Sequence, residues 1–221
     1  MGSITSYISI KKLNKPKIIF ICLVCFFCCA SQSKQTYYSL YPDKFFNGID
    51  WLKRNYDYAD SVINSFELNS KKVLALGIPE CSRYSTVQDY LESTSNFYLY
   101  VKLGTDYANF SIGRFQMKPS FVEKLETVIK NKSDLSEFRK LFPAPSNNTE
   151  KERKERLSRM EQDHWQIIYL CLVYKYLEYK FKSKTWKSEE EKIEFYATAY
   201  NIGFWKKESE ILKWKNTCSF P

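Results

Sequence analysis

The chain has 221 residues, with 34 Lys and Arg against 25 Asp and Glu and a formal net charge of +9. This length suits one domain with a proper hydrophobic core and an N-terminal appendage. No stripe of basic residues with interleaved stacking aromatics occurs in the sequence, which excludes a nucleic acid as the partner. The single histidine, His164, excludes a Ser-His-Asp triad and a multi-histidine metal site.

Residues 1–30 have the pattern of an export signal. Four lysines, with no acidic residue, precede an apolar run over residues 18–30. The run is too short for a membrane span, which needs about 20 residues, and fits the apolar region of a signal peptide. Cleavage after Ala30, a lipidated cysteine at Cys28 or Cys29 and an uncleaved membrane anchor remain alternatives. We predict export to the cell envelope, either into a periplasm or in association with an outer membrane.

Removal of that signal changes both the charge and the cysteine count. The remaining chain has 30 basic and 25 acidic residues, which is a net charge of +5. A mildly basic exported protein suits an anionic polymer such as a cell-wall glycan, or a lipid surface. Three cysteines remain, Cys81, Cys171 and Cys218, too few for a disulfide framework or a zinc site. An oxidising compartment permits one disulfide, and Cys81 with Cys218 is the favoured pair.

After a polar linker over residues 31–42, apolar residues at helical spacing predict a mostly α domain over residues 43–221. No alternating strand pattern, repeat or low-complexity block occurs. The expected helices cover residues 43–63, 70–78, 86–103, 121–131, a short stretch from 133, about 150–181, 189–202 and 204–214. Their expected caps are Asn69 or Ser70, capping boxes at Ser85 with Gln88, Ser120 with Glu123 and Ser188 with Glu191, and the terminal glycines Gly104 and Gly203. The charged residues 150–156 read as a solvated face.

Two places in this helical pattern suit a functional site. Pro79 ends or distorts its helix because proline lacks an N–H group and clashes with the preceding turn, which leaves Glu80 at a helix terminus. Apolar residues before Glu80 make a partly desolvated carboxyl with a raised pKa credible. Gly113 permits a tight turn that points residues 115–117 at whatever lies beside the next helix. The alternatives are a Glu80 carboxylate paired with Arg83 or a lysine, and a loop that only fills the core.

Two short blocks carry a family resemblance. Residues 113–120, Gly-Arg-Phe-Gln-Met-Lys-Pro-Ser, resemble the G-L-M-Q-x-x-P-S loop of lytic transglycosylases and goose-type lysozymes. Residues 199–203, Ala-Tyr-Asn-Ile-Gly, resemble the A-Y-N-x-G motif of the same enzymes. The resemblance implies a lysozyme-like helical domain with a sugar-binding groove, a peptidoglycan glycan strand as partner and neither cofactor nor metal. It also implies one catalytic glutamate upstream of the loop, which Glu80 matches by its order in the chain.

The resemblance makes Glu80 the catalytic residue. Glu80 would protonate the leaving oxygen and then take the proton of the sugar's own 6-hydroxyl, which gives a 1,6-anhydro product without a second carboxylate. The implied substrate-binding residues are Ser111, Gly113, Phe115, Gln116, Met117, Tyr200 and Asn201. Among them, Gln116 would hydrogen-bond an N-acetyl or hydroxyl group, and Met117 would contact the face of the sugar.

The aromatic residues and the wall of the site complete this set. Phe115 or Tyr107 would stack on a sugar ring, Tyr200 would reach the glutamate or the sugar, and Asn201 would hold the wall. The residues themselves leave another reading of Tyr200 open, since it could be a core aromatic with its hydroxyl at the rim.

The chain departs from the family pattern in three ways. Arg114 and Phe115 replace the family's Leu and Met, Glu80 lies 33 residues before Gly113, a longer gap than usual, and Pro79 and Cys81 flank the glutamate. These departures change the floor of the implied groove. They also mean that Glu80 is identified as the catalytic glutamate mainly by its position in the chain, upstream of the loop.

Three other interpretations stay open. A hydrolytic muramidase needs a second carboxylate, about 6.5–9.5 Å from the first for inversion or about 5–5.5 Å for retention, and the nearest candidates are Asp89, Glu92 and Asp106. A non-catalytic envelope protein would bind glycan without cutting it. An envelope scaffold with no sugar site would leave the blocks as coincidences of packing. We expect the protein to be a monomer.

Overall fold

The computed structural model describes residues 42–84, 96–143 and 148–216, all within a compact unit that spans Tyr41–Pro221. The described residues form helices and no strand, and their one isolated β-bridge joins Ile112 to Met117. The predicted mostly α class is therefore confirmed for this part of the chain. The predicted signal, most of the linker, the start of the predicted helix 86–103 and Cys218 lie outside the described residues.

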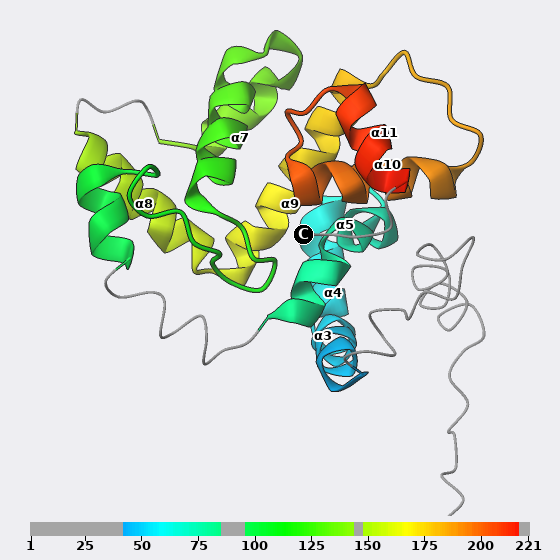
Figure 1. Cartoon of the computed structure of the whole chain (residues 1–221), viewed down its shortest axis with the longest axis horizontal. Helices are drawn as coiled ribbons and strands as arrows, with labels where there is room; N and C mark the ends of the chain where they lie inside the picture. The colour runs from blue at the N-terminus through cyan, green and yellow to red at the C-terminus, as the bar shows by residue number, and fades with distance from the viewer. Residues whose placement is uncertain (1–41, 85–95, 144–147, 217–221) are drawn as a thin grey trace, which may run out of the picture. The chain divides into compact units, whose positions relative to one another are not determined.

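The described helices are seen in chain order in Figure 1, coloured from blue to red. They are α3 (Pro42–Arg54), α4 (Tyr56–Asn64), α5 (Ser70–Arg83), a helix over residues 96–103, α7 (Pro119–Asn131), the 3-10 helix η1 (Ser133–Leu141), α8 (Thr149–Met160), α9 (Asp163–Lys180), α10 (Glu189–Ile202) and α11 (Glu208–Asn216). In these residues no helix is both long and apolar enough to cross a membrane.

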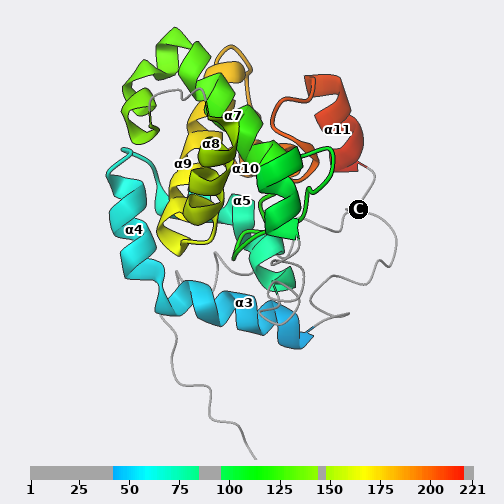
Figure 2. The same cartoon turned by 90° about the vertical axis from the view of Figure 1, so that its left-hand side faces the viewer.

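Two helices form the centre of the unit. Helix α5 packs against α3, α4, α9 and α10, and α9 packs against α4, α5, α7, α8 and α10. Residues 166–174 of α9 are all buried, which fits a helix that is apolar around its whole circumference. Figure 2 shows α3 running across one end of the helix cluster, where it contacts α5. The two central helices therefore hold the elements that carry the candidate site.

Several predicted helix ends are confirmed. Asn69 is the N-cap of α5, and its side chain accepts a hydrogen bond of 3.2 Å from the Lys72 N–H group. Gly104 and Gly203 have positive φ angles of 93° and 115° at the ends of their helices. Ser188 caps α10 by accepting from the Glu191 N–H group at 3.2 Å. These ends depend on residues close in the chain, so the local sequence is sufficient to place them.

Other predicted boundaries were wrong. Helix α5 runs through Pro79 to Arg83, which places Glu80 in its last turn. Helix α7 begins at Pro119 with Lys118 as its N-cap, so Ser120 and Glu123 form no capping box. Instead the Ser120 N–H group donates to Asn109 Oδ1 at 3.1 Å. A neighbouring loop supplies the cap, because proline occupies the first helical position and needs no partner for an N–H group.

The two longest predicted helices are each broken into two. Between α3 and α4 the Asn55 side chain donates to the Trp51 carbonyl at 2.8 Å, a side-chain bond that competes with the helical pattern. Between α8 and α9, Gln162 has extended backbone angles. The break leaves the Met160 carbonyl without its helical donor, and the Gln166 side chain donates to it at 2.7 Å.

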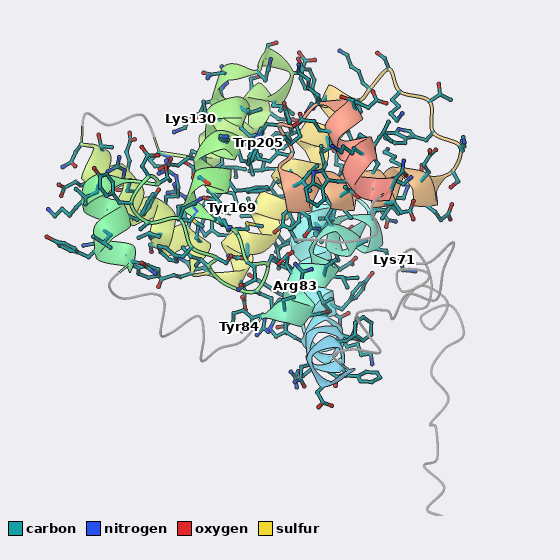
Figure 3. The ribbon with its side chains drawn as sticks, viewed as in Figure 1. Lys71, Arg83, Tyr84, Lys130, Tyr169 and Trp205 are labelled. Atoms are coloured by element: carbon teal, nitrogen blue, oxygen red, sulfur yellow. The ribbon has the colours of Figure 1, made fainter. Side chains whose placement is uncertain are left out.

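A buried group of charges ties α7, α8 and α9 together. Glu126 of α7 accepts from Arg156 Nε at 3.1 Å, from Arg159 Nη2 at 2.9 Å and from the Tyr169 hydroxyl at 2.9 Å. Tyr169 lies on α9 (Figure 3). Arg156 is buried rather than solvated, and its Nη1 also donates to the Tyr100 hydroxyl at 2.8 Å. The prediction of a solvated face over residues 150–156 was thus wrong at Arg156.

Candidate functional site

The loop over residues 112–117 is a tight turn closed by its own backbone. The Ile112 N–H group donates to the Met117 carbonyl at 2.9 Å, and the Met117 N–H group donates back at 3.1 Å. Gly113 and Gln116 both have positive φ angles, 67° and 51°. Such an angle is uncommon for a glutamine and costs of the order of 1 kcal/mol or more. The Gln116 side chain is half-buried and donates to the Gly113 carbonyl at 2.9 Å, which stabilises the turn.

Gln166 of α9 anchors this loop from inside the protein. Its side chain is fully buried, and its Oε1 accepts from the Phe115 N–H group at 2.9 Å. Its Nε2 donates to the Ile112 carbonyl at 2.9 Å as well as to Met160. A Cβ atom at Gly113 would lie 2.5 Å from that Nε2, so the position needs glycine. The sequence analysis missed Gln166, although an uncharged polar residue inside the apolar run of α9 was a signal.

Phe115 and Met117 point into the core. Both side chains are buried. The Phe115 ring lies against Gly77 of α5, where a Cβ atom would come within 2.5 Å of it, and packs edge-on to Trp51 with ring centroids 6.0 Å apart. The prediction that Phe115 and Met117 contact a sugar was wrong for this structure. Burial of these two apolar side chains instead fixes the loop onto α5.

Tyr200 of α10 supports the same loop. Its hydroxyl donates to the Phe115 carbonyl at 2.7 Å, and its side chain is buried. The pKa of Tyr200 is raised well above its ordinary value, first by burial and second by the charge of Glu80. Tyr200 therefore lies near Glu80 but bonds the loop backbone instead of the carboxylate. Asn201 beside it donates to the Ala197 carbonyl at 2.9 Å, within its own helix.

Glu80 presents a shielded carboxyl in the last turn of α5. Its side chain is 16% exposed, and its Oε1 lies 3.2 Å from Arg83 Nη1. Burial raises the pKa of Glu80, while the charges of Arg83 and Lys118 act in the opposite direction and lower it. The desolvation of the charged form outweighs both cations, so this carboxyl keeps its proton to a higher pH than an ordinary glutamate. The ion pair with Arg83, the alternative role weighed for Glu80, is present as well.

Three stretches that are distant in the sequence thus meet at one place. Helix α5 contributes Gly77 and Glu80, the loop contributes Phe115, and α10 contributes Tyr200. Of the predicted site residues, those partly open to solvent are Glu80, Ser111, Gly113, Gln116 and Asn201, whereas those that support the loop from below are Phe115, Met117 and Tyr200. This arrangement can present a ligand with a proton donor, Glu80, and with the amide of Gln116 on a rigid turn.

The described cysteines do not form a nucleophilic or metal-binding site. Cys81 and Cys171 are free and buried. Burial raises the pKa of Cys81 to about 12, so its thiol is not an activated nucleophile. The Cys81 thiol donates to the Gly48 carbonyl at 3.6 Å. Because Cys81 is a free thiol, the predicted disulfide between Cys81 and Cys218 was wrong. Within residues 42–84, 96–143 and 148–216, no group of three or more His, Cys, Asp and Glu side chains could hold a metal ion.

His164 has a surface role. It is exposed, and its Nδ1 lies 2.8 Å from the Tyr58 hydroxyl. His164 lies near the start of α9.

A scan against protein-family models found no match to this chain, and neither did searches of curated proteins and of solved structures.

Proposed function

We propose that this protein is a peptidoglycan lytic transglycosylase that cleaves the β-1,4 bond between N-acetylmuramic acid and N-acetylglucosamine. The observation that carries the proposal is the position of Glu80. Its shielded carboxyl, with a raised pKa, lies in one neighbourhood with Tyr200 and the turn that resembles the family loop. The two sequence blocks and the upstream glutamate thereby lie together in space, as an active site of that kind requires.

In the proposed mechanism Glu80 acts twice. The glycosidic oxygen must be protonated as its bond to the sugar breaks, and a carboxyl with a raised pKa keeps its proton to a higher pH than an ordinary glutamate does. The carboxylate formed in this step is stabilised by Arg83, whose Nη1 lies 3.2 Å away. Glu80 then accepts the proton of the sugar's 6-hydroxyl while that oxygen bonds to C1. The product carries a 1,6-anhydro ring, and no water is consumed.

The neighbouring residues bind and position. Gln116 has a half-buried amide with one bond to Gly113, and its remaining donor and acceptor atoms suit an N-acetyl group. Gln166, Phe115 and Tyr200 act through the loop, since each bonds or packs against it from within the protein. The export signal proposed for residues 1–30 would bring this activity to the cell envelope.

A non-catalytic glycan-binding protein is the second candidate. The ion pair between Glu80 and Arg83 favours it, because a lasting pair holds the carboxylate in its charged form. Arg114 and Phe115, which depart from the family loop, favour it as well. A hydrolytic muramidase would need a second carboxylate, and of its three candidates only Asp106 lies in the described residues, where it is exposed in a turn.

The deciding experiment is digestion of purified sacculi with analysis of the released fragments by mass. A muropeptide lighter by one water indicates the anhydro ring, and a hydrated reducing end indicates hydrolysis. Glu80→Gln should lower release by at least about 100-fold. Glu137→Gln, at an exposed position of η1, is the matched control and should retain the rate. If Glu80→Gln releases muropeptides at the wild-type rate, Glu80 has no part in the mechanism. If the sacculi stay intact and retain the protein, the result favours the non-catalytic glycan-binding protein.

A further inference from the structure

Arg114 lies beside the proposed site with its guanidinium against two aromatic rings. Its Cζ is 3.9 Å from the ring centroid of Tyr84 and 4.8 Å from that of Trp51. Tyr84 directly follows α5, and Figure 3 shows it next to Arg83 at the end of that helix. Stacked rings cover the faces of a planar guanidinium and leave its edge, where all five N–H donors lie. These two ring contacts restrict the movement of the guanidinium.

Those donors have no partner in the described part of the chain. Arg114 makes no hydrogen bond and no ion pair there, and its Nε is buried without an acceptor. Leaving a buried donor unsatisfied costs about 1–3 kcal/mol. The buried arginines 156 and 159 differ in this respect, since both are bonded to Glu126. A rigid arginine with unused donors is suited to an external acceptor.

The surrounding charges favour an anion as that acceptor. Arg83 and Lys118 act on Glu80, and Arg114 acts on Asp163, which is exposed. Glu80 is already paired with Arg83. Among the described residues these are three cations and two carboxylates, and neither carboxylate is bonded to Arg114. A carboxylate with two oxygens fits the fork of a guanidinium in a bidentate pair.

We infer that Arg114 is the recognition residue for a carboxylate of the glycan substrate, bound beside Glu80 through the edge of its guanidinium. In peptidoglycan this carboxylate belongs either to the stem peptide or to muramic acid. The nature of the polymer rests on the proposed function, but the anion site itself does not require Glu80 to be catalytic. Arg114 stands where the resembling family has leucine, so this selectivity is a property of this chain.

The test uses soluble probes that lack the scissile bond. These are N-acetylglucosaminyl-N-acetylmuramyl tetrapeptide, the same compound with its carboxyl groups amidated, the peptide-free disaccharide and chitobiose, and calorimetry gives each Kd. The protein should bind at least one of the two carboxylate probes about tenfold more tightly than the two neutral probes, because one charge-assisted pair is worth that factor or more. Equal affinity for charged and neutral probes, or no binding of any probe, would overturn the inference.

Substitutions assign the preference to Arg114. Arg114→Leu should remove it, and Arg114→Lys should retain part of it, since lysine keeps the charge and loses the fork. Arg139→Leu, at an exposed position of η1, is the control and should keep the full preference. A full preference in folded Arg114→Leu or unchanged tight binding in Arg114→Lys would contradict the assignment.

The probes also separate the two sources of the carboxylate. In the tetrapeptide compound the carboxylates are on the peptide, whereas the peptide-free disaccharide carries only that of muramic acid. A preference seen with the first alone identifies the stem peptide, and one seen with the disaccharide identifies muramic acid. Both outcomes support a carboxylate site. Since no step requires cleavage, failure of the Glu80 proposal would leave these results unaffected.

Discussion

Glu126 and Glu80 are two shielded glutamates in very different surroundings. The Glu126 side chain is 3% exposed and bonds two arginines and the Tyr169 hydroxyl. The Glu80 side chain is 16% exposed and pairs with Arg83 among the described residues, and burial raises its pKa. The first carboxylate is surrounded by donors on every side, as structural groups in a protein interior are. The second retains capacity for a proton or a ligand.

The arginines repeat this difference. Arg156 and Arg159 donate hydrogen bonds to Glu126. The N–H groups of Arg114 have no hydrogen-bond partner among the described residues. Satisfied charges join the helices α7, α8 and α9, and incompletely satisfied charges gather at the end of α5 beside the loop. Proteins violate the rule of satisfied polar groups most often where they act on other molecules.

Neutralising each of the two glutamates should have opposite effects on stability. Glu126→Gln leaves two buried arginines without their carboxylate and should lower the free energy of unfolding by about 3–5 kcal/mol. Glu80→Gln removes a charge that burial disfavours and should leave that free energy unchanged or slightly higher at pH 7. Urea denaturation of both variants measures the difference. Equal losses of stability would show that the two glutamates play the same structural role.

A smaller effect is expected where the loop meets the core. Gln166→Ala removes three hydrogen bonds to buried backbone groups, and should destabilise the fold by about 1–3 kcal/mol. It should also lower the release of muropeptides, because the turn loses its anchor. Gln162→Ala is the matched control, since that side chain is exposed and its one bond within the described part of the chain goes to the Ser158 carbonyl of α8. Full activity in Gln166→Ala would mean that the turn keeps its shape without the anchor.

The pH dependence of stability is the smallest expected effect. The folded-state pKa of Glu80 is raised above its model-compound value of 4.5. Its contribution to stability is therefore fully present below about pH 4.5 and is lost as the pH rises through the raised value. The stability advantage of Glu80→Gln over the wild type should grow over that interval, as thermal unfolding at several pH values would show. Activity should decline over the same interval, and a constant difference in stability would contradict the raised pKa.

The sequence by itself determined the helical class, several helix ends and the places of the turn and of the glutamate. These features depend on residues a few positions apart: Asn69 caps the helix it precedes, and the positive φ angles at Gly104, Gly113 and Gly203 follow from the freedom of glycine. The resemblance of residues 113–120 is likewise contained in one short stretch. Its predicted sugar contacts failed at Phe115 and Met117, because a motif does not say which side chains face the core.

Only the tertiary structure decided which distant residues meet. Gln166 lies 51 positions from Phe115, and Tyr200 lies 85 positions from it, yet both bond the backbone of that residue. Arg156 became a buried residue because Glu126 faces it from another helix. Arg114 lies against an aromatic ring because the end of α5 brings Tyr84 to it. Burial and charge pairing depend on the neighbours that folding brings together, and a linear pattern does not specify them.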